Sequence, residues 1–166
     1  MNYRYKISLF FALCFCFLLL TNCASDGSCR QTVAVSLGIE FYKSDFDIVQ
    51  EQYVYEPYFD TLTIFGLGND SLLANNLTIR EIRLPLKPFA NQSTYIFERK
   101  HLLPDTITFF YKNENNFISL ECGCLVFHRI TDIENTFYNI DSVVVKNNFA
   151  ADEQAKNIRI YFKNFW

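Results

Sequence analysis

The sequence predicts an all-β domain, an antiparallel β-sandwich or a small barrel-like sheet of about eight strands, behind a cleaved N-terminal signal helix. Three observations lead to this prediction. Apolar and polar residues alternate with period two in several segments, which is the pattern of half-buried strands. Aromatic residues make up 17% of the chain and occur together with β-branched residues, as strands prefer. Clusters rich in asparagine separate these segments and predict turns.

The N-terminal segment carries a targeting signal. Arg4 and Lys6 precede an apolar run of about 14 residues, 7–20, which fits a secretory signal and is short for a transmembrane helix of roughly 20. Leu20-Thr21-Asn22-Cys23 resembles the lipobox of bacterial lipoproteins, with asparagine in place of the usual small residue before the cysteine. The resemblance implies cleavage before Cys23, a diacylglycerol on its thiol and an acyl chain such as palmitate on its amine. Ala24, by the same resemblance, implies outer-membrane retention.

This segment sets the predicted domain organisation. We expect a lipoprotein signal peptide over residues 1–22, a short tether over 23–30 and a single β-sandwich domain over 31–166. A signal cleaved without lipidation, or an uncleaved anchor, is the alternative. Removing the signal changes the net charge from −3 to −5. Because such a chain has no basic stripe to neutralise phosphates, we expect no nucleic-acid partner.

The strand segments follow one another through the rest of the chain. The first shows the alternation best, since Val33, Val35, Leu37, Ile39 and Phe41 share one parity. Turns are predicted at 66–70, 75–76, 112–116 and 147–148, and short helices only at 71–74 and 150–155. The predicted strands are 31–42, 50–56, 60–65, 78–86, 93–99, 105–112, 116–128, 139–146 and 156–163.

Three cysteines remain after the signal and the lipid site, namely Cys29, Cys122 and Cys124. An oxidising envelope compartment favours disulfides. A bridge between Cys122 and Cys124 on one strand would span about 6.6 Å, near the upper limit for a disulfide. We therefore expect a long-range bridge from Cys29 to Cys122 or Cys124, with three reduced, buried thiols as the alternative.

The sequence offers little for catalysis or metal binding. Cys124 and His128 would lie about 13 Å apart on a strand, too far for both to ligate one zinc ion. The two histidines, His101 and His128, lie in no nucleophile motif, and Gly66-Leu67-Gly68 lacks the rest of a dinucleotide-binding loop. We therefore predict no catalytic residue, no metal and no cofactor, and we do not expect an enzyme.

One segment is a candidate binding surface. Tyr53-Val54-Tyr55-Glu56-Pro57-Tyr58-Phe59 places four aromatic rings within seven residues. Such a segment could form an aromatic platform for a glycan or a protein partner. Packing inside the domain is the alternative, because aromatic residues of β domains more often fill the core.

A short motif occurs four times. Asp60-Thr61-Leu62, Asp70-Ser71-Leu72, Asp105-Thr106-Ile107 and Asp141-Ser142-Val143 each join an aspartate to a hydroxyl residue and an aliphatic residue. The motif resembles the O-glycosylation sequon of Bacteroidetes extracytoplasmic proteins, and this resemblance implies modification at Thr61, Ser71, Thr106 and Ser142. The alternative is structural, because Asp-Thr and Asp-Ser often end a turn before a strand.

Taken together, the motifs resemble a family of uncharacterised Bacteroidetes (Bacteroidales) lipoproteins, domain of unknown function 6452. The resemblance implies a β fold, an envelope location and a disulfide between Cys29 and Cys122, with Cys124 as an additional cysteine and alternative partner. It implies no activity. The resembling stretches are Cys29 with residues 33–42, Leu62–Gly68, Ile82–Lys87, Asp105–Phe109, Glu121-Cys122-Gly123 and Ile158–Phe162.

The functional expectation is an outer-membrane lipoprotein, periplasmic or surface-facing, that acts without catalysis as a binding or envelope accessory domain. Its partners would be the membrane, through the lipid anchor, and an envelope protein or glycan. A small integral eight-stranded outer-membrane β-barrel is the alternative, because Asn164-Phe165-Trp166 resembles the terminal aromatic signature of such barrels. Arg80, Arg83 and Arg159, near the middles of predicted strands, count against it.

Overall fold

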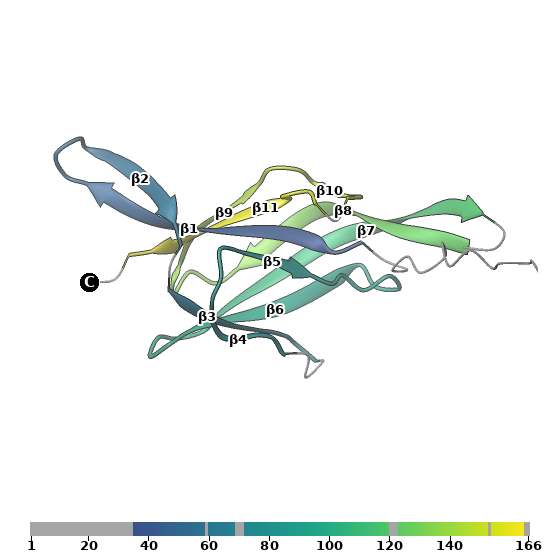
Figure 1. The fold of residues 1–166 in the computed structure, drawn as a ribbon, viewed down its shortest axis with the longest axis horizontal. Helices are drawn as coiled ribbons and strands as arrows, with labels where there is room; N and C mark the ends of the chain where they lie inside the picture. The colour runs from purple at the N-terminus through teal and green to yellow at the C-terminus, as the bar shows by residue number, and fades with distance from the viewer. Residues whose placement is uncertain (1–34, 59, 69–71, 120–122, 153, 165–166) are drawn as a thin grey trace, which may run out of the picture. The chain divides into compact units, whose positions relative to one another are not determined.

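A computed structural model describes residues 35–58, 60–68, 72–119, 123–152 and 154–164, and Figure 1 shows their arrangement. Strands account for most of them. In chain order they are β1 (Leu37–Asp47), β2 (Gln52–Pro57), β3 (Thr61–Gly66), β4 (Leu72–Thr78), β5 (Glu81–Leu84), β6 (Gln92–Arg99), β7 (Asp105–Ser119), β8 (Gly123–Asn135), β9 (Ile140–Val145), β10 (Phe149–Ala150) and β11 (Ile158–Lys163).

The strands form two sheets. One has the order β2-β1-β11-β9, with β5 also paired to β1, and the other has the order β10-β8-β7-β6-β3-β4. In Figure 1 the two sheets lie one over the other, with β1 and β5 above β6. The predicted all-β sandwich is thus confirmed. The described residues contain no helix that is long and apolar enough to cross a membrane.

One strand pair departs from the predicted antiparallel arrangement. β1 and β11 run parallel, with Ile39 opposite Ile158 and Tyr42 opposite Tyr161. A parallel pair cannot be joined by a tight turn and needs a long connection. Here all the other described strands lie between β1 and β11 along the chain, so the alternation within each segment could not reveal this pairing.

The core lies between the sheets and follows the predicted parity. Leu37, Ile39 and Phe41 of β1 are at most 1% exposed. From β11, Ile158, Ile160 and Phe162 are fully buried. The second sheet contributes apolar side chains of β3, β6 and β7: Leu62, Ile64, Tyr95, Phe97, Ile107, Phe109 and Tyr111. Burial of this apolar surface is the main stabilising contribution, at about 25 cal/mol per Å².

The predicted turn at 112–116 is wrong, because these residues continue β7. Asn113 pairs with His128 and Asn115 with Val126, so β7 and β8 form one long antiparallel hairpin. Glu114 also forms an ion pair with Arg129, at 2.6 Å between Oε1 and Nε. Asparagine tolerates a turn but does not require one. The partner strand supplies the hydrogen bonds that make the segment extended.

The two predicted short helices are also corrected. Residues 72–78 form β4, in which Ala74 is buried and pairs with Ile64 of β3. Residues 149–150 form β10, and the described residues from 151 to 155 contain a turn and no helix. Helices this short have too few internal hydrogen bonds to persist, whereas an adjacent sheet edge offers the backbone complete pairing.

The β1–β2 hairpin extends past the sandwich. The pairing of β1 with β11 ends at Ser44 opposite Lys163, whereas its pairing with β2 continues to Asp47 opposite Gln52. Figure 1 shows the resulting ribbon projecting beyond the other strands at the left. Both faces of its outer part are therefore open to solvent.

Candidate binding surface

A row of aromatic rings lies on the outer face of the five-stranded sheet. Opposed residues on neighbouring strands share a face, so Tyr42 and Phe46 of β1 lie on the same side as Tyr53 and Tyr55 of β2 and Tyr161 of β11. The ring centroids are 5.2 Å apart for Phe46 and Tyr53, 4.6 Å for Tyr55 and Tyr161, and 5.6 Å for Tyr42 and Tyr161. We call these five residues the aromatic row.

The outer members of the row are strongly exposed. Tyr53 is 58% exposed, Tyr55 53% and Phe46 49%. These rings brace one another but leave about half of their surface free. Tyrosine also offers an apolar body and a polar tip, which is why it is common at binding interfaces. The row can therefore bury apolar contact area against a ligand and hydrogen-bond to it.

The structure divides the aromatic platform predicted at residues 53–59. Tyr53 and Tyr55 lie on the exposed face, whereas Tyr58 is 2% exposed and packs 4.9 Å from the Phe162 ring. Phe59 lies outside the described residues. The sequence reasoning missed Tyr42, Phe46 and Tyr161, because only the strand register brings them beside Tyr53 and Tyr55.

A charged pair lies on the same outer face, next to the Tyr42 end of the row. Arg159 donates from Nε to Glu40 Oε2 at 2.9 Å, and its guanidinium carbon lies 5.1 Å from the Tyr42 ring centroid. The hydrogen bond that Arg159 donates to Glu40 raises the pKa of Arg159 above its ordinary value. Arg159 therefore stays protonated and adds a cation–π contact to the end of the row.

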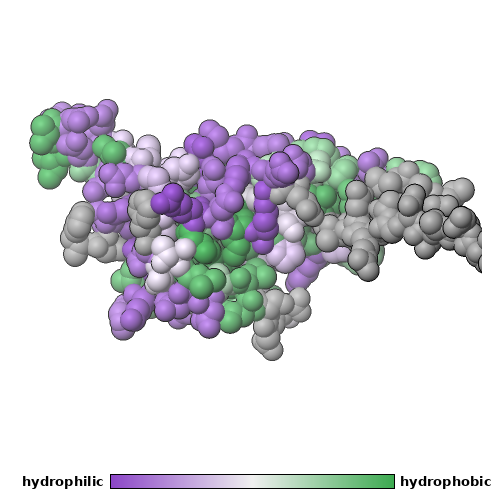
Figure 2. All heavy atoms as spheres, in the orientation of Figure 1, coloured by the Kyte–Doolittle hydropathy of each residue, from purple (hydrophilic) through white to green (hydrophobic). Residues whose placement is uncertain are grey.

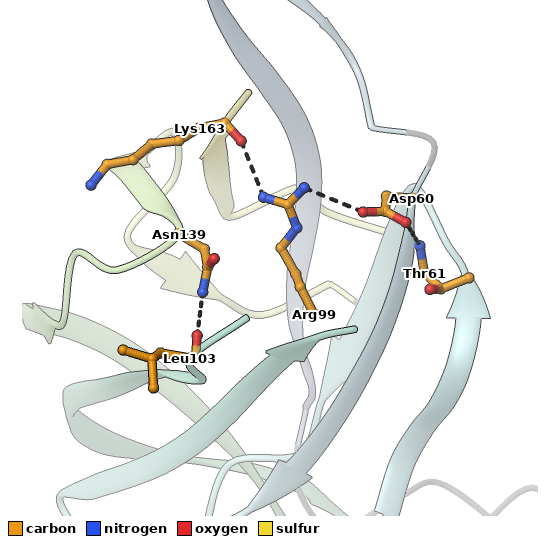
Figure 3. Close-up of polar contacts among 6 residues, drawn as sticks. All are labelled: Asp60, Thr61, Arg99, Leu103, Asn139 and Lys163. Atoms are coloured by element: carbon orange, nitrogen blue, oxygen red, sulfur yellow. Dashed lines mark hydrogen bonds and ion pairs between the residues drawn. The ribbon is translucent and has the colours of Figure 1, made fainter. Parts of the chain in front are cut away.

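Arg99, at the end of β6 in the other sheet, makes several polar and aromatic contacts between the sheets (Figure 3). Its Nη1 donates to the Lys163 carbonyl at 3.1 Å, and its Nη2 lies 3.2 Å from Asp60 Oδ2. The guanidinium carbon is 5.7 Å from both the Tyr58 and the Phe162 ring centroids. Burial raises the pKa of Tyr58, and the charge of Arg99 opposes this shift.

A cavity of about 310 Å³ opens beside Arg99. It is lined by Lys43, Glu56, Pro57, Tyr58, Asp60, Arg99 and Asn164. Two basic and two acidic side chains thus face the same space, so the lining favours neither an anion nor a cation. The bond of Arg99 to the Lys163 carbonyl joins the two sheets, which gives this arginine a role in the fold.

The Asp60-Thr61 and Asp105-Thr106 motifs both stand at the start of a strand. Asp60 Oδ1 accepts from the Thr61 backbone N–H at 2.7 Å immediately before β3, as Figure 3 shows. Asp105 opens β7 and is fully buried. These positions agree with the structural reading of the motif. Modification of Thr61 and Thr106, which are both half-buried, stays a prediction.

Asp105 binds the β8–β9 connection. Its Oδ1 accepts from the Thr136 hydroxyl at 2.7 Å and the Tyr138 N–H at 2.8 Å. Its Oδ2 accepts from the N–H groups of Asn139 and Ile140, at 2.7 and 3.1 Å. Four donors compensate the cost of burying the carboxylate. Sequence reasoning did not identify this role, although an aspartate before a strongly alternating strand was a usable signal.

Of the other predicted modification and disulfide residues, the structure describes only Ser142 and the backbone of Cys124. Ser142 of β9 is half-buried and pairs with Tyr161, so it lies beside the aromatic row. Ser71, Cys23, Cys29 and Cys122 lie outside the described residues. The backbone of Cys124 belongs to β8 and pairs with Phe117. The lipidation, the disulfide and the glycosylation therefore all stay predictions.

The two histidines lie apart. His101 is exposed, in the connection that follows β6, while His128 of β8 is fully buried. Asn113 donates from Nδ2 to the carbonyls of Pro88 and Ala90, so its Oδ1 accepts from His128 Nδ1 at 2.8 Å. Burial lowers the pKa of His128, and its Nε2 has no hydrogen-bond partner within the described part of the chain.

His128 is therefore neutral and packs edge-on against the Tyr111 ring, 5.1 Å away. The described residues contain no group of three or more His, Cys, Asp or Glu side chains that could hold a metal ion.

The comparisons with known proteins give one match. Residues 61–162, from the first residue of β3 to near the end of β11, match the family of unknown function DUF6452. No curated protein and no solved structure matches the chain. The matched segment covers the whole six-stranded sheet but only β5, β9 and most of β11 of the other sheet, and it begins after the β1–β2 hairpin.

Proposed function

The chain belongs to the family of unknown function DUF6452, and from this premise we propose that it is an outer-membrane lipoprotein whose sandwich domain acts by binding, without catalysis. The observation that carries the proposal is the aromatic row. Its Tyr53, Tyr55 and Phe46 rings are about half exposed, on a hairpin that extends past the sandwich.

The anchor is assigned to Cys23. The apolar run over residues 7–20 ends three residues before this cysteine, as a lipoprotein signal requires. Two or three acyl chains would hold the protein at the membrane, because each buried methylene contributes about 0.8 kcal/mol. The proposed tether and the first residues of the domain connect Cys23 to the start of β1 at Leu37.

The polar groups of the described interior support a role without catalysis. Asp105 accepts four hydrogen bonds from the β8–β9 connection, and Arg99 joins Asp60 to the Lys163 carbonyl. His128 is buried and held by Asn113. Each group serves the fold, and none faces a nucleophile in an open cleft, as general acid–base catalysis would need.

The anchor is tested by labelling the native host with radioactive palmitate. We expect the wild-type protein to incorporate the label and to remain with the membranes after carbonate extraction. The Cys23→Ala chain should take up no label and should be released by carbonate. A Cys23→Ala chain that stays in the carbonate pellet would contradict a tethered domain, and labelling of that variant would contradict the assigned site.

The binding role is tested by cosedimentation of the purified, unlipidated mature chain with outer-membrane vesicles from the native host. We expect the wild-type chain to pellet with the vesicles and the Tyr53→Ala/Tyr55→Ala variant to lose at least tenfold in affinity. Phe89→Ala is the matched control, because Phe89 is 96% exposed and lies outside the row. Equal retention of all three chains would overturn the role of the row.

A further inference from the structure

We propose that the tip of the β1–β2 hairpin inserts into a protein partner that presents an apolar pocket bordered by basic residues. The tip consists of residues 46–53. The inference rests on the proposed function, since it names the class of partner that the same surface would bind. It is carried by the exposure, the rigidity and the charge of the hairpin.

The tip gathers several exposed hydrophobic side chains in one place, as protein-interaction sites do. Ile48 is 82% exposed and Val49 93%, and Phe46 and Tyr53 flank them at 49% and 58%. Figure 2 shows this apolar group at the far end of the projecting hairpin, next to hydrophilic surface. Beyond Ser44, β1 pairs only with β2 among the described strands. The tip therefore stands clear of the sandwich and can enter a cavity.

The tip is also ordered by its own contacts. Asp47 Oδ1 accepts from the backbone N–H groups of Val49 and Gln50, at 2.8 and 3.1 Å. The Phe46 and Tyr53 rings pack edge to face below the turn, with centroids 5.2 Å apart. Isoleucine and valine have few rotamers to lose when they are buried. A partner would therefore meet a preorganised tip, which lowers the entropic cost of binding.

The charge of the hairpin indicates the character of the partner. Residues 43–57 contain four acidic side chains, Asp45, Asp47, Glu51 and Glu56, against the single basic side chain of Lys43. Like charges disfavour a second copy of this chain and an anionic lipid surface. Ile48 and Val49 also provide no ring face or hydrogen-bonding group for a glycan. A basic rim around an apolar pocket complements both properties of the tip.

Photo-crosslinking in the native host tests the inference. The full-length lipoprotein would carry p-benzoyl-phenylalanine in place of Val49, of Tyr55 or of Phe89. We expect a protein adduct of one defined mass from Val49, and none of that mass from Phe89, the exposed control. The captured protein, once purified, should bind the wild-type chain, at least tenfold less tightly in 500 mM than in 50 mM salt, because screening weakens charge pairing.

Two serine variants complete the test. Ile48→Ser/Val49→Ser should weaken binding to the captured protein at least tenfold, and Phe89→Ser should leave it unchanged. An adduct of twice the chain's own mass, or one that is removed by glycan cleavage and resists protease, would overturn the inference. So would equal affinity of the tip variant. An adduct from Tyr55 without one from Val49 would overturn the tip contact while leaving the binding function standing, and adducts from neither would contradict both.

Discussion

Two aromatic clusters lie on opposite faces of the same pair of strands. Phe41 and Phe162 face the second sheet, with ring centroids 5.9 Å apart and exposures of at most 1%. Their chain neighbours Tyr42 and Tyr161 lie 5.6 Å apart on the outer face and continue into the exposed rings of the hairpin. The comparison shows that similar residues one position apart either hold the fold together or remain available for binding.

The largest difference is expected between Phe162 and Tyr161. Phe162→Ala should lower the free energy of unfolding by about 3–5 kcal/mol, because it removes a buried ring from the contacts with Phe41 and Tyr58. Tyr161→Ala, one residue earlier, should lower it by about 1 kcal/mol. Urea unfolding of the mature chain measures both. Equal losses would mean that the outer ring is as important to the fold as the inner one.

A buried and an exposed aspartate should likewise differ in their effect on stability, by a smaller amount than the two aromatic residues. Asp105→Ala would leave buried N–H groups of Asn139 and Ile140 without an acceptor, and we expect a loss of about 3 kcal/mol. Asp132→Ala is the matched control. Asp132 is exposed, and within the described part of the chain its side chain accepts a hydrogen bond only from the N–H of Ile133. Its loss should stay below about 1 kcal/mol. Thermal unfolding of the two variants measures both losses, and equal losses would contradict the role given to Asp105.

The interior should also respond to acid through His128. Burial lowers the pKa of its imidazole in the folded chain, so the unfolded chain binds a proton more readily as the pH falls through the ordinary value of about 6.5. Stability contributed by neutral His128 is therefore present above that pH and is lost below it. We expect His128→Gln to flatten the pH dependence of the unfolding free energy between pH 7.5 and 5. An unchanged slope would contradict the assignment.

The smallest effect is expected on the hairpin. Tyr53→Ala should change stability by no more than about 1 kcal/mol, because more than half of the ring is already in water. A double-mutant cycle of Phe46→Ala and Tyr53→Ala should give a coupling of about 0.5 kcal/mol from their edge-to-face contact. A coupling near zero would mean that the two rings do not brace the tip in solution.

Much of the fold was predictable because alternation is a local property. The parity of residues 37–41 in β1, and the strands predicted at 93–99 and 156–163, agree with the structure. The asparagine-rich segment 112–116 and residues 72–74 were misread, because local preference there is weak and pairing with a neighbouring strand decided the conformation. The platform at 53–59 was half correct, with Tyr53 and Tyr55 outside and Tyr58 inside.

Residue order alone specifies that the chain forms strands and which side chains of the first and last strands face inward, since a strand alternates its faces residue by residue. Which strands are neighbours depends on contacts between segments that are distant in the chain. The parallel pairing of β1 with β11 places Tyr161 beside Tyr42 and Tyr55, although these residues lie far apart in the chain. The physical reason is that register is fixed by the burial of whole faces and by backbone hydrogen bonds between distant segments, which no local pattern encodes.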